Sequence, residues 1–323
     1  MISIRMRRMI SDLLAGRGLV LRKLASEEAL LRQFDNAMQL AIDARASETA
    51  GASDVAGIVF SMNRPLQLDA LLRSYKACVS DRAPLSVLYS ATSEPYESAF
   101  QELAEMHAGS GVTFIREQDF RTDLISVLDT LDAGAVFFLV DDLIFTRPVD
   151  MRYLSSIDLQ QFVPSIRLGR NLTRCYTMDA AQALPGLTLH ERVGEIDYLS
   201  WSWRDGEHDW GYPLSVDGNL FLTAEMRAMA SICEYRSPNT FEQALQWCRW
   251  RFLSRQGICP QTSMLLNIPY NKVQTENDNY HGTVDETTML DHWQNGMMID
   301  TDAYQGVVNE SAHQEFELKL TRR

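Results

Sequence analysis

The chain has 323 residues, of which 46% are hydrophobic and 23% are charged, and its formal net charge is −13 at pH 7. This composition is typical of a globular protein with enough apolar material for one large domain or two ordinary ones. The acidic balance argues against nucleic-acid binding, which generally relies on a basic surface. The five cysteines are odd in number and show no C-x-x-C spacing, so neither a disulfide framework nor a zinc site is indicated. The simplest interpretation is a reduced, cytoplasmic protein.

The start of the chain is basic although the remainder is acidic. Residues 1–33 contain seven Lys/Arg and three Asp/Glu, a net charge of +4. Such a segment is compatible with peripheral contact with the inner face of a membrane or with an acidic protein surface, and the favoured interpretation is a helix packed on its own domain with a solvated basic face. Asp12, Gly16 and Arg17 interrupt the apolar run, so no signal peptide is expected. No segment approaches the roughly 20 apolar residues of a membrane-spanning helix.

Three parts are expected along the chain. Residues 21–46 carry apolar side chains at three- and four-residue spacing, which predicts a long amphipathic helix, and the small polar stretch that follows predicts a linker. We therefore expect a helical N-terminal extension over 1–50, an α/β half over 55–150, and a mixed half with C-terminal helices and tail over 151–323.

Short apolar runs alternate with helical patterns in the α/β half. The predicted strands are 56–61, 85–90, 112–116 and 135–140, and the predicted helices between them are 65–79, 96–108 and 119–131. Alternating strands and helices indicate right-handed crossovers and a parallel sheet covered on both faces. The predicted fold class is therefore α/β, with a mostly parallel, Rossmann-type sheet flanked by helices. Beyond Pro148 the segments look extended, and helices return at 223–235 and 241–257.

Polar side chains follow several of the predicted strands. They are Ser61, Asn63 and Arg64 after the first strand, Arg121 after the third, and Asp141 and Asp142 after the fourth. Ligands of open α/β sheets bind at the carboxyl ends of the strands, so these groups are expected to converge. Arginine suits diphosphate recognition, and a carboxylate pair suits a hard cation such as Mg²⁺ or Mn²⁺.

The two aspartates lie inside the apolar run VFFLVDDLIF. Adjacent side chains of a strand point to opposite faces, and an ionised carboxylate buried without a partner is very costly. Solvent at the strand end, a cationic side chain or a metal ion would each compensate this cost, and an inert acidic turn is the alternative. There is no G-x-G-x-x-G after the first strand and no P-loop motif, which argues against a dinucleotide dehydrogenase and a P-loop enzyme.

In these features the chain resembles the GT-A-type glycosyltransferases, the nucleotide-sugar-dependent class whose acidic DxD motif follows the fourth strand. The matching pieces are IVFSMNRP, FRTDL and FFLVDDLIF, each at the corresponding strand or helix start. The resemblance covers residues 55–150 well and 150–285 loosely. It implies a nucleotide-sugar donor, a saccharide or lipid-linked acceptor, and Mn²⁺ or Mg²⁺ as the cofactor.

The acidic motif departs from the family pattern, because Val140 stands at its first acidic position. The resemblance implies that Asp142, at the last position, is a direct metal ligand and that Asp141 faces the ribose or a metal-bound water. It further implies that Ser61, Asn63 and Arg64 contact the nucleotide and that Arg121 lies near the diphosphate. His281 is a candidate for a late-chain metal ligand, with an ordinary surface histidine as the alternative.

The segment GEHDWGYPLSVDGNLF is the candidate acceptor region. An inverting transferase needs a base for the acceptor hydroxyl, and carboxylates commonly serve. Asp217 is the predicted base and Asp209 the reserve, although Asp-Gly is also a common hairpin turn. Trp210 and Tyr212 are candidates for stacking on a sugar, with core packing as the alternative.

The expected function is metal-dependent transfer of a sugar from a nucleotide-diphosphate sugar to a hydroxyl acceptor, with inversion. A sugar nucleotidyltransferase is a second hypothesis, although the segment SMNRPLQ lacks the glycines that such enzymes carry after the first strand. A third hypothesis is a non-catalytic scaffold of GT-A-like fold that binds a partner through its N-terminal helix. The sequence specifies neither the donor sugar, nor the acceptor, nor whether the reaction inverts or retains configuration, nor the oligomeric state.

Overall fold

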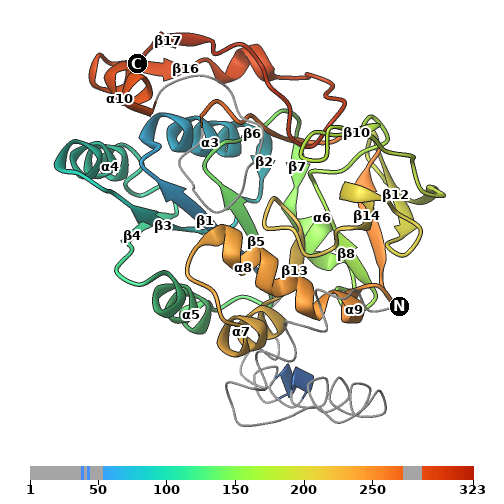
Figure 1. Ribbon diagram of the computed structural model, residues 1–323. Helices are drawn as coiled ribbons and strands as arrows, with labels where there is room; N and C mark the ends of the chain where they lie inside the picture. Colours follow the sequence, from blue (N-terminus) through green and yellow to red (C-terminus); the bar gives the residue numbers. More distant parts are fainter. Residues whose placement is uncertain (1–37, 40–41, 44–53, 272–285) are drawn as a thin grey trace. The chain divides into compact units, whose positions relative to one another are not determined.

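The computed structural model describes residues 38–39, 42–43, 54–271 and 286–323 (Figure 1). The chain divides into two compact units, Met1–Glu48 and Thr49–Arg323. The described residues of the first unit are helical, and the Gln39 amide donates a hydrogen bond to Asp43 Oδ1 at 2.7 Å, one turn further on. The basic start of the chain, with its predicted membrane contact, lies outside the described residues.

A five-stranded sheet forms the centre of the second unit, with the strand order β13-β5-β1-β3-β4. Its strands are β1 (Val55–Met62), β3 (Leu85–Ser90), β4 (Val112–Arg116), β5 (Ala135–Val140) and β13 (Leu220–Leu222). The first four pair in parallel, and β13 runs antiparallel to β5. The predicted mostly parallel sheet and its four parallel strands are therefore confirmed.

Helices cover both faces of this sheet (Figure 1). They are α3 (Pro65–Cys78), α4 (Glu94–Met106), α5 (Phe120–Thr130) and α7 (Thr223–Ile232). Pro65 occupies the first turn of α3, where its missing N–H costs nothing, and the Asp119 side chain caps α5 by accepting the Thr122 N–H at 2.9 Å. The apolar side chains of β5 alternate between the two layers, since Phe137 stacks on Tyr75 of α3 whereas Phe138 faces the opposite side.

A second, four-stranded sheet has the order β11-β12-β14-β8. Its strands are β8 (Phe162–Pro164), β11 (Thr188–Val193), β12 (Ile196–Ser202) and β14 (Gln256–Pro260). The helix predicted over 241–257 is instead α8 (Pro238–Leu245), a 3-10 turn and α9 (Arg249–Phe252). Its predicted end forms β14, because pairing with β12 and β8 overrides the local helical pattern.

Short elements complete the second unit. They are β2 (Val79–Ser80), β6 (Leu143–Phe145), β7 (Val149–Asp150), α6 (Met151–Ser156), β9 (Arg174–Cys175), β10 (Ala180–Ala181), the 3-10 turns η1 (His208–Gly211) and η3 (Thr301–Tyr304), β15 (Leu265–Asn267), α10 (Glu286–Gln294), β16 (Met297–Ile299) and β17 (Leu320–Arg322). None of the helices in the described part of the chain combines the length and apolar character needed to cross a bilayer.

Two pairings around β5 position the site. The strand β6, which directly follows the two aspartates, pairs with β15, and the Ile268 N–H donates to the Asp142 carbonyl at 2.9 Å. On the other side, β13 pairs with β5, and the Gly218 N–H donates to the Phe138 carbonyl at 2.8 Å. The segment that contains Asp217 is thereby hydrogen-bonded to the strand that ends in Asp141 and Asp142.

Candidate functional site

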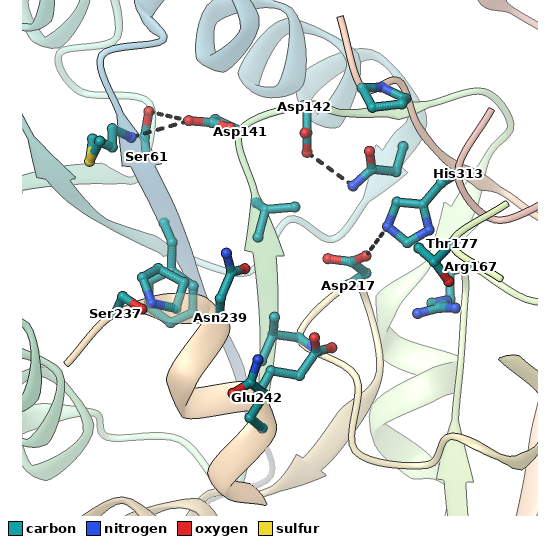
Figure 2. A pocket seen from close by; sticks show the side chains of 18 of the residues that line it. Ser61, Asp141, Asp142, Arg167, Thr177, Asp217, Ser237, Asn239, Glu242 and His313 are labelled. Carbon is teal, nitrogen blue, oxygen red and sulfur yellow. Dashed lines mark hydrogen bonds and ion pairs between the residues drawn. The ribbon is translucent and has the colours of Figure 1, made fainter. Parts of the chain in front are cut away.

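A cavity of about 840 Å³ opens at the carboxyl ends of β1 and β5. The loop before β13, the first turn of α8 and the C-terminal segment supply its other walls (Figure 2). Its acidic lining residues are Glu117, Asp141, Asp142, Asp209, Asp217 and Glu242. Its basic lining residues include Arg64, Arg167 and His313. This position is the one at which open α/β sheets bind ligands.

Asp141 fixes the turn after β1. Its Oδ2 accepts hydrogen bonds from the Ser61 hydroxyl at 2.8 Å and from the Met62 N–H at 3.2 Å. Its Oδ1 accepts from Arg64 Nη1 at 3.0 Å. Figure 2 accordingly shows the carboxylate turned toward Ser61. Both oxygens of Asp141 are therefore occupied by donors of the preceding strand and turn.

Asp142 points away from Asp141 and faces the other side of the cavity (Figure 2). Its Oδ2 accepts from Arg64 Nη1 at 3.1 Å, and its Oδ1 accepts from the Asn267 amide at 3.0 Å. Burial raises the pKa of Asp142 to about 6; Arg64 opposes the rise, and the charges of Asp141 and Asp217 add to it. Asp142 is thus a carboxylate for which the local environment provides only partial compensation.

Arg64 is the cation that compensates the acidic pair. One guanidinium nitrogen donates to both aspartates, and the other donates to the backbone carbonyl of Asn271. Burial lowers the pKa of Arg64, but the two carboxylates outweigh it and raise the pKa above its usual value. Of the three compensations considered for the run VFFLVDDLIF, the structure contains the cationic side chain.

Two ion pairs lie on the side of the cavity that includes the loop before β13. The Asp217 Oδ2 and His313 Nε2 atoms are 3.3 Å apart. Arg167 pairs with Asp209 and donates to the Ser215 hydroxyl at 2.6 Å. Burial raises the pKa of Asp217, but the hydrogen bond and charge of His313, helped by Arg167, hold it below its ordinary value. Burial likewise lowers the pKa of His313, and Asp217 outweighs it and raises the pKa.

Glu242 is a further carboxylate on this side, carried by α8. Its Oε1 accepts the Val216 N–H at 3.0 Å, which orients the side chain beside the loop that contains Asp217. Burial, and then the charge of Asp217, raise the pKa of Glu242 to about 7, against the smaller effects of the Val216 N–H and Arg167. Its environment therefore places this group near the midpoint of its titration at neutral pH.

Most of the residues predicted from the sequence line this cavity. They are Ser61, Arg64, Asp141, Asp142, Asp209, Tyr212 and Asp217. Three others are placed elsewhere. Asn63 exchanges hydrogen bonds with Thr92 at 2.8 and 2.9 Å, and Arg121 donates to two backbone carbonyls at the end of α7. Trp210 is fully buried, and its indole N–H donates to the Leu172 carbonyl at 3.1 Å. The predicted ligand His281 lies outside the described residues.

Four site residues were not predicted from the sequence: Arg167, Glu242, Asn267 and His313. Arg167 follows β8, Glu242 sits in an amphipathic helix, and the remaining two come from β15 and the polar tail. None of them belongs to a recognisable motif, since each reaches the cavity through pairing between segments far apart in the chain. The local sequence at His313, HQE, matches no functional motif, so only the histidine itself could have indicated a site there.

The fit of a divalent cation depends chiefly on Asp142. Within the described ranges, no three His, Cys, Asp or Glu side chains gather into a metal-binding group. Mg²⁺, however, is commonly held by one or two protein carboxylates together with substrate phosphates. Asp142 fits as such a ligand, because it lines the cavity and a nearby cation would stabilise its ionised form. Asp141 fits less well, because donors of the β1 turn occupy both of its oxygens.

No protein-family model matches the chain, and no curated protein matches it either. Among solved structures, a mannosyltransferase from Pyrobaculum calidifontis, PcManGT in complex with GDP-Man and Mn²⁺, is 19% identical over 45% of this chain and 48% of its own, with a TM-score of 0.29. TarS from S. aureus is 12% identical over 73% of this chain and 38% of its own, with a TM-score of 0.42. A nucleotidyl transferase from Methanothermobacter is 10% identical over 75% of this chain and 98% of its own, with a TM-score of 0.40.

The chain thus spans less than half the length of the first two proteins. Each TM-score lies below 0.5, so these similarities do not indicate an activity for this chain. A function is therefore inferred from the chemistry of the cavity.

Proposed function

We propose that the protein is a glycosyltransferase that moves a sugar from a nucleotide-diphosphate sugar to a hydroxyl of a saccharide or lipid-linked acceptor. The observation that carries this proposal is the two-ended cavity at the carboxyl ends of β1 and β5. One end holds Arg64 and Asp142, and the other holds Asp217 and Glu242. A cavity of about 840 Å³ is in the range of small-molecule sites. Both reactants of a sugar transfer therefore have a chemically suitable end.

The charge at the first end supports a role for a divalent cation. Arg64 with two ionised aspartates carries a net charge of −1, which would repel a diphosphate. A divalent cation bound to Asp142 would reverse this charge to +1. When bound, the cation would neutralise charge that develops on the leaving diphosphate. Arg64 would hold both carboxylates in place.

The second end supplies the proton acceptor. The acceptor oxygen attacks the anomeric carbon, the bond from that carbon to the diphosphate oxygen breaks, and a carboxylate takes the hydroxyl proton. Both carboxylates predicted from the sequence line the cavity in charged pairs, Asp209 with Arg167 and Asp217 with His313, and Glu242 of α8 lines the cavity as well. Attack from this side, opposite to the diphosphate, would invert the anomeric configuration.

A thermal-shift screen of UDP-, GDP- and dTDP-sugars with Mn²⁺ tests the proposal, and a CMP-sugar, which has no diphosphate, serves as the control donor. We expect one nucleotide sugar to raise the Tm, and both a chelator and Asp142→Ala to remove the effect. Glu234→Gln, an exposed substitution outside the cavity, should leave it intact. Indifference to every donor would contradict the proposal. Pyrophosphate release from a nucleoside triphosphate and a sugar 1-phosphate would favour a nucleotidyltransferase instead.

A further inference from the structure

Three carboxylates, those of Asp142, Asp217 and Glu242, lie one after another along the cavity. Figure 2 shows Asp217 between Asp142 and Glu242. The electrostatics agree, since the charge of Asp217 raises the pKa of both of its neighbours. Asp142 belongs to the end proposed for the diphosphate. The middle carboxylate therefore lies where the transferred sugar would bind, and Glu242 lies beyond it.

The middle carboxylate is poorly suited to take a proton. Asp217 is 7% exposed and its carboxylate is paired with His313 at 3.3 Å. Protonation would remove the charge that attracts a protonated His313, whose side chain is only partly exposed, and this loss is unfavourable. A carboxylate held ionised in a buried site is well suited to stabilise positive charge that develops nearby. The transition state of glycosyl transfer has such charge on the sugar ring.

Glu242 has the complementary properties. It is more exposed to the cavity than Asp217, and the Val216 N–H fixes one of its oxygens at 3.0 Å. The charged or titratable groups that act on it are Asp217 and Tyr212 from the loop before β13, and Arg167 from the segment after β8. Unlike Asp217, Glu242 forms no salt bridge with a basic side chain of the described residues. Gaining a proton would therefore break no ion pair.

We propose that Glu242 accepts the proton of the acceptor hydroxyl, and that Asp217, positioned by His313, stays ionised and stabilises the positive charge on the sugar. This assignment rests on the proposed function. The acceptor oxygen forms its bond to the anomeric carbon while its proton passes to a Glu242 oxygen. The bond between that carbon and the diphosphate oxygen breaks, and its electron pair leaves with the diphosphate. Glu242 afterwards releases the proton to water.

The titration of Glu242 gives this assignment a distinctive pH dependence. A base works in its ionised form, and its pKa is raised to about 7, chiefly by burial. Turnover should therefore rise with pH through about 7 and level off above it. A base with the pKa of Asp217, which is held below its ordinary value, would give a profile that is flat across neutrality.

The test measures release of nucleoside diphosphate by the full chain, with Mn²⁺ and the nucleotide sugar that stabilises it. Glu242→Gln keeps an oxygen for the Val216 N–H, and we expect it to retain the Tm shift but to lose roughly 10²- to 10⁴-fold in turnover, together with the rise near pH 7. Azide is a nucleophile that carries no proton to remove. It should therefore restore turnover in Glu242→Ala, with a glycosyl azide as product, and should not restore it in Asp217→Ala.

Any of three other outcomes would overturn the assignment of Glu242 as the base. Rescue of Asp217→Ala but not of Glu242→Ala by azide would make Asp217 the base. A Tm shift with unchanged turnover in Glu242→Gln would remove Glu242 from the chemistry while leaving the proposed function intact. Absence of a Tm shift with any nucleotide sugar would overturn the proposed function, and the assignment with it. His313→Gln adds a check on the positioning role, because it should raise the pKa of Asp217 and lower turnover, and azide should not restore that lost turnover.

Discussion

Replacing Asp142 with asparagine should make the folded protein more stable above pH 6 while it weakens donor binding. Burial raises the pKa of this carboxyl from 3.8 to about 6, and this net value already includes the attraction of Arg64. One pKa unit corresponds to about 1.4 kcal/mol, so the ionised carboxylate costs the fold about 3 kcal/mol above pH 6. Asp142→Asn removes a cost of that size, because the amide is neutral in both states.

The sign of the pH dependence follows from the direction of the shift. Between pH 3.8 and about 6 the folded protein binds more protons at Asp142 than the unfolded chain does. This group therefore lowers the stability as pH rises through that range, and its cost is absent below it. The gain from Asp142→Asn should accordingly be about 3 kcal/mol at pH 7.5 and close to zero below pH 4.

The neighbouring groups can accommodate the new amide. Asn267 currently donates to Asp142, and its own Oδ1 is buried without a hydrogen-bond partner among the described residues. A flip of the Asn267 amide would present this oxygen to the new NH₂ group at the cost of its interaction with Asp217, and Arg64 would still donate to the new carbonyl oxygen. The substitution therefore need not leave two donors facing one another.

Urea denaturation of both proteins at pH 7.5 and pH 4 measures the difference in unfolding free energy. The thermal shift by nucleotide sugar and Mn²⁺ provides the parallel readout of binding, which should be lost. A variant that is less stable than the wild type at pH 7.5 would refute the reasoning, since it would mean that the ionised carboxylate stabilises the fold.

Three further substitutions have distinct expected outcomes. Arg64→Met leaves two buried carboxylates without their cation and should lower the unfolding free energy by about 3–5 kcal/mol in urea; a loss below about 1 kcal/mol would contradict the compensating role. In Gly57→Ala the new methyl would lie 2.4 Å from Leu85 and 2.5 Å from Phe137, so melting should reveal a loss of about 1–3 kcal/mol. Arg121→Met removes hydrogen bonds to two carbonyls of the α7 end and should lower stability by about 1–3 kcal/mol. Its Tm shift with donor should match the wild type, and a lost shift would restore the diphosphate role predicted from the sequence.

The central sheet could be predicted because its signals are local. Buried parallel strands are continuous apolar runs, and AVFFLV at Ala135–Val140 is such a run between a polar turn and the aspartates. Proline and glycine mark several of the helix boundaries around it, as Pro65 does for α3. The helix predicted across β14 was wrong because Gln256–Pro260 forms its hydrogen bonds with strands remote in the sequence. Local periodicity contains no information about such partners.

The part of the cavity at the carboxyl ends of β1 and β5 could be predicted for a related reason. Parallel strands end at the same edge, so residues after β1 and β5 meet there whatever the details of the loops. The direction of a single side chain is a different matter. Arg121 lies in the first turn of α5, yet its guanidinium reaches back to α7, which only the packing of the two helices determines. His313 meets Asp217 across a sequence separation of 96 residues that no short-range pattern connects.

Strand β5 gives both ends of the cavity a common support. Asp141 and Asp142 directly follow its last residue, and the segment with Asp217 is hydrogen-bonded along one flank through β13 and Gly218. The spacing between Asp142 and Asp217 is thus set by strand register. Changes in the length of the loop before β13 could consequently alter the acceptor while the donor end keeps its geometry, which would let this scaffold acquire new acceptors without losing its chemistry.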